Sequence, residues 1–164
     1  MTKSHFFRDR LLVRVIIVLF VGFMTLNASA DNLEIALGMR DGAPSAEKLI
    51  EIAGNEDKLV SRLLELRLSD QPFVSSRSLA LLLKYSHREE VKTALLEDML
   101  AADRRGLAKQ IVTGINSVSD SAFRLSIAKS AVARASFDKK FVDTAKILES
   151  SEDVSIKEVA KSIK

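Results

Sequence analysis

The sequence predicts an all-α fold, and three observations support this prediction. The 164 residues contain no run in which apolar and polar positions alternate between turns, the pattern of a half-buried strand. Long stretches are rich in Leu, Ala, Lys, Glu and Ser, with only two prolines and six glycines. Apolar positions also recur about every 32 residues, which is the length of a helix pair. Together these patterns favour short helices joined by tight turns.

The first 30 residues have the form of a secretory signal peptide. A basic stretch is followed by the apolar run "VIIVLFVGFMTL", and the small residues Ala28 and Ala30 then fit the −3 and −1 positions of a signal-peptidase site. A membrane span needs roughly 20 apolar residues, more than this run offers. We therefore expect cleavage after Ala30 and a periplasmic or secreted protein. The alternative is an uncleaved anchor in the inner membrane, and in both cases the membrane is contacted only through this segment.

Cleavage would remove the excess of positive charge. Residues 1–30 contain four of the 25 Lys and Arg residues and one of the 22 Asp and Glu residues, which leaves 21 of each in the remaining 134 residues. A nucleic-acid-binding domain normally carries a basic patch. The balanced charge therefore predicts no nucleic-acid partner. The length corresponds to one ordinary domain, preceded by a loose lead-in over residues 31–44 with room for one helical turn.

The helical domain is predicted over residues 45–164, and capping residues mark its first four helices. Ser45 and Asn55 precede helices over residues 46–53 and 56–68. Pro72 suits the first turn of a helix to residue 85, because its missing N–H would be unpaired there. The sequence "SHRE", residues 86–89, has the form of a capping box and predicts a helix over residues 88–101.

Four further helices are predicted toward the C-terminus. We expect them at 103–118, 120–134, 137–150 and 152–163, with starts at Asp103, at Ser119 or Asp120, at Ser136 and at Ser151. Their joints are very short, which is typical of antiparallel neighbours.

Apolar positions repeat at a spacing of 32 residues. Two registers stay apolar through four copies, and a third does so through three. They are Leu63, Leu95, Ile127 and Val159; Leu64, Leu96, Ala128 and Ala160; and Leu83, Ile115 and Ile147. A helix pair cannot bury its apolar face alone, so this pattern predicts that each pair stacks on the next.

The stretch "LLELRLSDQPFVSSRSLALLL", Leu63 to Leu83, resembles a HEAT repeat of the short bacterial kind. It has a leucine-rich first helix, an Asp in the turn, and a second helix with an Arg followed by spaced apolar residues. The resemblance extends over residues 55–164, although the turn "ADRRG" departs from the usual pattern and Phe141 replaces the Arg in the third copy. It implies a short right-handed α-solenoid of antiparallel helix pairs, in which Asp70 and Arg77 form a structural ladder. An irregular helical bundle is the alternative.

A solenoid of this kind would present the second helix of each pair on its concave side. Three polar residues of these helices, Lys84, Lys109 and Asn116, would then face a partner, with Tyr85 as the best candidate for an exposed aromatic anchor. The turn at residues 103–106 could contact an anion, although an interhelical turn is its simpler role.

The residues predict no catalytic or metal site. The chain has no cysteine, which excludes a lipid-anchored cysteine, a disulfide scaffold and the usual zinc ligands. His87 is the only histidine after residue 30, and it lies in a predicted turn. The adjacent pairs Glu89-Glu90 and Glu97-Asp98 point in different directions from their helix, and no glycine-rich phosphate loop occurs. We expect neither cofactor nor enzymatic activity, although an enzyme that uses only carboxylates is left open.

The sequence thus predicts an exported, non-enzymatic protein that binds another protein in the cell envelope of a bacterium. The alternative is a small helical inhibitor or regulator of an envelope enzyme, which would use a single loop or edge. The identity of the partner is not encoded in any motif.

Overall fold

A computed structural model of the protein describes residues 32–42, 44–101 and 106–163. Every regular element in these ranges is helical, which confirms the all-α prediction. The chain forms two compact units, residues 1–58 and 59–164. The boundary lies within helix α3, Glu56–Leu66. The predicted cleavage site at Ala28 and Ala30 lies outside the described residues.

The first unit contains more regular structure than the predicted lead-in. Residues 32–38 are helical, and helix α2, Ala46–Ala53, follows. The apolar residues Leu33, Leu37 and Leu49 are buried, since the spacing of three to four residues places apolar side chains on one face of a helix. The backbone N–H of Lys48 donates to Ser45 Oγ, so the predicted cap of α2 is confirmed.

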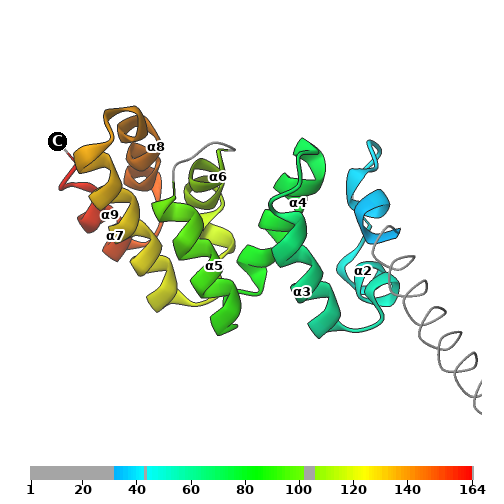
Figure 1. Ribbon diagram of the computed structural model, residues 1–164. Helices are drawn as coiled ribbons and strands as arrows, with labels where there is room; N and C mark the ends of the chain where they lie inside the picture. The colour runs from blue at the N-terminus through cyan, green and yellow to red at the C-terminus, as the bar shows by residue number, and fades with distance from the viewer. Residues whose placement is uncertain (1–31, 43, 102–105, 164) are drawn as a thin grey trace, which may run out of the picture. The chain divides into compact units, whose positions relative to one another are not determined.

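The second unit consists of short helices and 3₁₀ turns (Figure 1). After the end of α3, the elements are α4 (Pro72–Lys84), α5 (Glu89–Leu100), α6 (Leu107–Thr113), η1 (Ile115–Ser117), α7 (Ser121–Phe137), η2 (Lys139–Phe141), α8 (Val142–Lys146), η3 (Ile147–Ser150) and α9 (Val154–Ala160).

Alternate helices of this unit pack against each other. Helix α7 contacts both α5 and α9, and α6 contacts both α4 and α8. The two sets, which we call the first row (α5, α7 and α9) and the second row (α4, α6 and α8), are joined by contacts of α5 with α6 and of α7 with α8. The row to which a helix belongs therefore alternates along the chain.

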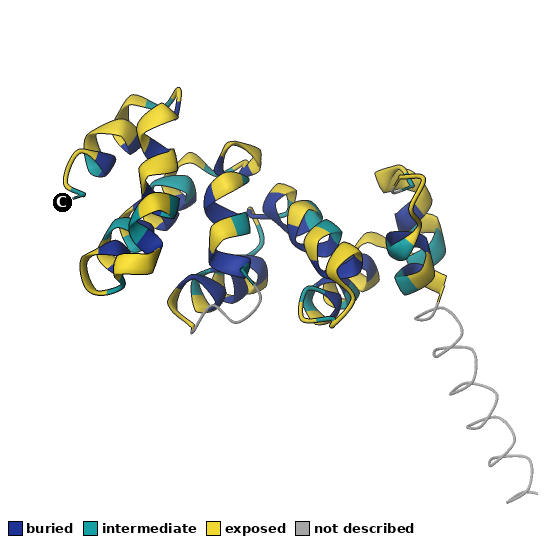
Figure 2. Ribbon diagram, turned by 90° about the horizontal axis from the view of Figure 1, so that it is seen from above, coloured by how far each residue is buried: buried dark blue, intermediate teal, exposed yellow. Residues whose placement is uncertain are grey.

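The repeated apolar positions supply much of the core between the helices (Figure 2). Leu63, Leu95 and Ile127 are each 0% exposed. The same register is only half-buried at Val159, in the last helix. The third register is buried at Leu83 and Ile115 but exposed at Ile147. The second register is half-buried at Leu64 and Leu96 and buried at Ala128 and Ala160. The first and third registers are thus lost from the core toward the C-terminus, where α8 is short and continues as a 3₁₀ turn, whereas the second register is buried there.

Two caps in the middle of the chain form as predicted. Asn55 Oδ1 accepts a hydrogen bond of 2.8 Å from the backbone N–H of Lys58, and Asp120 Oδ1 accepts one of 3.0 Å from that of Phe123. Pro72 is the first residue of α4. These starts depend on contacts within one helical turn, and the local sequence is sufficient to specify them.

The capping box predicted at residues 86–89 is wrong. Helix α5 begins at Glu89, and its N-cap residue Arg88 makes no capping bond with its side chain. The hydroxyl of Ser86 is instead buried and accepts a hydrogen bond of 3.1 Å from the backbone N–H of Ser119. Ser86 therefore ties the start of α5 to the start of α7 rather than capping its own helix.

The single helices predicted over residues 103–118 and 137–150 are both interrupted. Helix α6 ends at Thr113, and Gly114 separates it from the 3₁₀ turn η1. Helix α7 runs through Ser136, whose hydroxyl donates to the carbonyl of Ala133 instead of capping a new helix. The next turn starts at Asp138, and the predicted helix is divided among η2, α8 and η3. Residues 103–105, where the first of these helices was expected to begin, lie outside the described residues.

Candidate functional site

A groove of about 320 Å³ lies between α4 and α6 of the second row. Its lining residues come from both helices and from the segment that follows α6: Ser76, Leu79, Ala80, Leu83, Lys109, Gln110, Thr113, Gly114 and Ser117. Leu79 and Leu83 are buried, whereas Ser76, Ala80 and Thr113 are exposed. The groove therefore has apolar residues at its base and small or polar residues at its surface.

The base of the groove depends on close packing between Leu83 and Gly114. A Cβ atom added at Gly114 would collide with Cδ1 of Leu83 and would lie 3.2 Å from the carbonyl oxygen of Gln110. The φ angle of Gly114 is −87°, which any residue can adopt. Glycine is thus required at position 114 because the side chain of Leu83 leaves no room for a Cβ atom, and not because of the backbone conformation.

One of the four predicted partner-binding residues lines this groove. Lys109 is exposed on α6, and its side chain has no hydrogen bond or ion pair with any other described residue. Lys84 is exposed one helical turn after Ala80, at the end of α4, and is likewise unpaired among the described residues. Among the described residues, these two ammonium groups lie next to the groove without a charged partner.

The other two predicted residues lie outside the groove lining. Tyr85 is half-buried as the C-cap residue of α4, with its ring centroid 6.3 Å from that of His87. Asn116 is exposed in η1, between the lining residues Gly114 and Ser117. The structure thus brings Lys109 to the groove, places Lys84 and Asn116 beside it, and leaves Tyr85 partly covered.

Several lining residues were not predicted from the sequence. Thr113 lies four residues after the predicted Lys109 on α6, and Ser76 and Ala80 have the same spacing on α4. Such spacing places residues on one side of a helix, so a stripe of small and polar residues was visible in the sequence. Nothing in the sequence showed that the two stripes face one groove.

The predicted ladder residues lie near the turn between α3 and α4. Asp70 is exposed in this turn, and Arg77 is half-buried on α4 with its guanidinium carbon 5.7 Å from the ring centroid of Phe73. Another ion pair nearby joins the end of α3 to α5, since Arg67 Nε donates to Asp98 Oδ2 at 2.8 Å. Both of these side chains are nearly buried, at 11% and 8% exposed. Arg67, the residue after α3, is thereby bound to Asp98 of α5.

Two surface ion pairs connect successive helices of the first row. Lys92 Nζ of α5 lies 3.0 Å from Asp120 Oδ2, and Arg124 Nη1 of α7 lies 3.9 Å from Asp153 Oδ2. In each pair a cation near the start of one helix meets the N-cap carboxylate of the next helix in the row. Lys92 and Arg124 are 32 residues apart, so the two pairs are equivalent in the repeat.

These contacts shift the pKa values of both groups of the first pair. The backbone N–H of Phe123 and the ammonium of Lys92 lower the pKa of Asp120 below its ordinary value. Hydrogen bonds to Glu89 and then to Asp120 raise the pKa of Lys92. Both groups are therefore held in their charged forms at neutral pH.

A buried arginine joins the end of α5 to α7. Arg134 Nη1 donates to the carbonyls of Met99 at 2.8 Å and Ala101 at 3.0 Å, which α5 leaves without partners inside the helix. The guanidinium carbon lies 4.6 Å from the ring centroid of Phe141. This residue is explained by packing and requires no ligand.

The described residues contain no constellation that indicates metal binding. No group of three or more His, Asp or Glu side chains could hold a metal ion in this part of the chain. His87 is exposed in the turn before α5. Within the described ranges, no helix combines the length and the apolar character that a bilayer crossing requires.

In comparisons with known proteins, no family model, no curated protein and no solved structure matches this chain.

Proposed function

We propose that this chain is an exported, non-enzymatic helical-repeat protein that binds another protein through the groove between α4 and α6. The groove is the observation that carries the proposal. It joins an apolar base to small exposed residues and to the exposed side chain of Lys109. Apolar surface with a few polar groups at its edge is the usual composition of a recognition site.

The arrangement of helices supports a HEAT-like, right-handed α-solenoid of antiparallel pairs as the finer description of residues 59–163. Contacts between alternate helices, within a first and a second row, are those expected when each pair stacks on the next. The 32-residue relation between the Lys92 and Arg124 ion pairs has the same origin. In such a solenoid the second row carries the binding surface, and the groove lies on that row. Export is proposed from the signal-peptide form of residues 1–30.

The groove can be tested by filling it. Ala80 is exposed on α4 and lines the groove, so Ala80→Trp would place an indole ring in it with little effect on the core. Ala133 is exposed on α7 of the first row and provides the control Ala133→Trp. The two variants and the wild-type chain would each be immobilised and exposed to an envelope fraction.

We expect one stoichiometric partner to be retained by the wild type and by Ala133→Trp, and to be lost with Ala80→Trp. Circular dichroism and thermal melting would show that all three chains are equally folded. Retention of the partner by Ala80→Trp would exclude the groove as the binding site.

A further inference from the structure

We infer that the partner presents an acidic segment of polypeptide to the groove between α4 and α6, with an apolar side chain over the groove base and carboxylates at Lys84 and Lys109. This inference rests on the proposed function and adds the chemistry of the partner to it. It is carried by the distribution of charge on the two helices, by the lack of partners for these lysines among the described residues, and by the composition of the groove.

The two helices that form the groove carry only positive charge. Residues 72–84 and 107–117 contain no Asp or Glu, whereas they contain Arg77, Lys84 and Lys109. Lys84 and Lys109 have no carboxylate partner among the described residues, so they contribute a positive potential at this surface. The groove therefore attracts a negatively charged chain and repels a positively charged one.

Lys84 and Lys109 differ from Lys92 of the first row in having no partner among the described residues. Lys92 of α5 contacts both Glu89 and Asp120, at 3.0 Å in each case. Lys84 and Lys109 make no such contact with any described residue. Lys109 is also the third residue of α6, where a cation opposes the helix dipole. Its charge does not stabilise its own helix and is available to a ligand.

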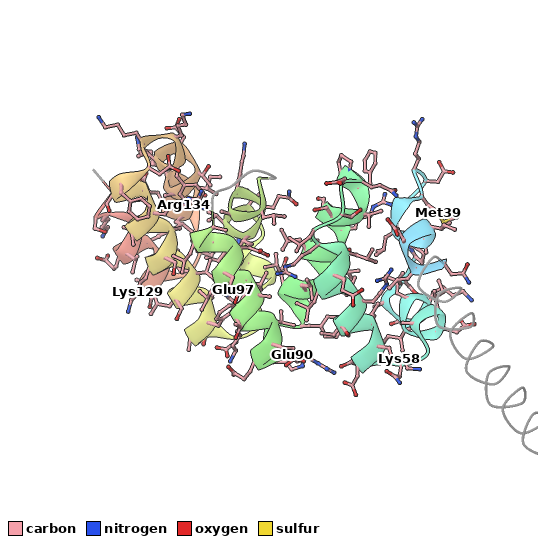
Figure 3. All side chains as sticks on the ribbon, in the orientation of Figure 1. Met39, Lys58, Glu90, Glu97, Lys129 and Arg134 are labelled. Carbon is pink, nitrogen blue, oxygen red and sulfur yellow. The ribbon has the colours of Figure 1, made fainter. Side chains whose placement is uncertain are left out.

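Helix α5 of the first row carries the opposite charge, with four acidic residues and one lysine. Glu89, Glu90 and Glu97 are exposed on α5, and Figure 3 labels the latter two on this helix. An acidic chain would be repelled from these residues and attracted to the groove on the second row. This asymmetry favours one orientation of an acidic partner and increases its rate of association.

The groove is large enough for a short segment of peptide and has a place for one apolar side chain. Its volume of about 320 Å³ is near the lower end of the roughly 300–1,000 Å³ that ligand pockets occupy. Leu79 and Leu83 form the base, and Ala80 and Thr113 lie above them. A peptide with one apolar anchor between acidic residues would match both the base and the two lysines.

A selection from a library of random twelve-residue peptides, displayed on phage, tests this charge preference without knowledge of the partner. The full chain would be the target, and the same selection would be made on K84E/K109E, on Ala80→Trp, and on a control with two exposed first-row lysines reversed, K129E/K157E. Sequencing would give the excess of Asp and Glu over Lys and Arg in each enriched pool. The best peptide would be synthesised with a fluorescent label and titrated at 50 and 300 mM salt.

We expect an acidic pool on the wild type and on K129E/K157E, no acidic pool on K84E/K109E, and no enrichment on Ala80→Trp. Binding of the best peptide should weaken by about tenfold in K84E/K109E, since two attractive contacts become repulsive, and it should weaken as salt increases.

A neutral or basic pool on the wild type, the same pool on K84E/K109E, or no enrichment on any chain would overturn the inference. If a neutral pool is lost on Ala80→Trp, the groove remains the binding site and only the acidic partner is excluded. If enrichment persists on Ala80→Trp, the proposed function itself fails.

Discussion

The hydroxyl of Ser78 has an unusual environment among the described side chains. Ser78 is 0% exposed on α4, and its Oγ has no hydrogen-bond partner in the part of the chain that the structure describes. Ser75, one turn earlier on the same helix, is also buried, but its Oγ donates to the carbonyl of Arg67 at 2.6 Å. The two serines therefore differ mainly in whether the hydroxyl is satisfied.

This difference predicts opposite effects of the same substitution. Ser78→Ala removes an unsatisfied polar group and should raise the free energy of unfolding by about 1 kcal/mol. Ser75→Ala removes a hydrogen bond and leaves the Arg67 carbonyl without this partner, so it should lower the free energy of unfolding by about 1 kcal/mol. Because both changes gain the same helix propensity, the comparison isolates the hydrogen bond. Urea denaturation of the two variants measures the effect, and equal shifts would show that the hydroxyl of Ser78 is satisfied in solution.

At the scale of elements, the join between α6 and η1 depends on Gly114. Its φ of −87° gives an alanine no conformational penalty, and alanine would normally favour a helix. The methyl group would nevertheless meet Cδ1 of Leu83. Gly114→Ala should therefore lower the free energy of unfolding by about 1–3 kcal/mol, the range for overpacking.

A double-mutant cycle would identify the cause of this destabilisation. Leu83→Ala alone creates a cavity, but it also makes room for the new methyl group of Gly114→Ala. The double variant should consequently be more stable than the sum of the two single changes predicts. Additive effects, measured by thermal or urea unfolding, would mean that Leu83 is not the neighbour that excludes a side chain at position 114.

The sequence predicted elements correctly where a single helical turn determines them. The caps at Asn55 and Asp120 and the start at Pro72 are of this kind. The capping box at Ser86 failed because a distant residue, Ser119, binds its hydroxyl. The start predicted at Ser136 failed because α7 continues through this residue and its hydroxyl donates within that helix.

The candidate site was predicted only in part, for the same reason. Lys109 was identified from its place in the repeat, and it lines the groove. The pairing of Leu83 with Gly114 depends on how closely α4 approaches the end of α6, a tertiary distance that no local pattern encodes. The ion pair of Arg67 with Asp98 joins residues 31 positions apart, and it escaped prediction because many other pairings were equally compatible with the sequence.

At the scale of the whole molecule, the regular period of the chain is reflected in its charges as well as in its core. The pairs Lys92–Asp120 and Arg124–Asp153 each connect neighbouring helices of the first row. Since Asp120 also caps α7, protonation of its carboxylate weakens a helix start and an interhelical contact together. The stability of the second unit is therefore coupled to pH through this residue.

The direction of this coupling follows from the pKa of Asp120. The folded state lowers this pKa, so the unfolded chain binds the proton more tightly, and the stabilisation is fully present above the unfolded pKa of about 3.9. It is lost as pH falls through the lower, folded pKa. The pKa of Lys92 is raised in the folded state, so Lys92 affects stability at alkaline pH. Its stabilisation is lost as pH rises through the pKa of the folded state, which lies above the unfolded value of about 10.4. Stability should therefore be greatest between these limits.

The variant Asp120→Asn tests the acid limb of this profile. Asn is also a good N-cap residue, so α7 keeps its start while the charge and its titration are removed. We expect Asp120→Asn to be less stable than the wild type at pH 6 and to lose less stability between pH 6 and pH 2. Urea midpoints measured over this range would show the two profiles converging in acid.

In a Lys92→Met background the substitution should have a smaller effect at pH 6, because the ion pair is already absent. Parallel profiles for the wild type and Asp120→Asn would contradict the coupling, since they would show that Asp120 titrates alike in the folded and unfolded chains.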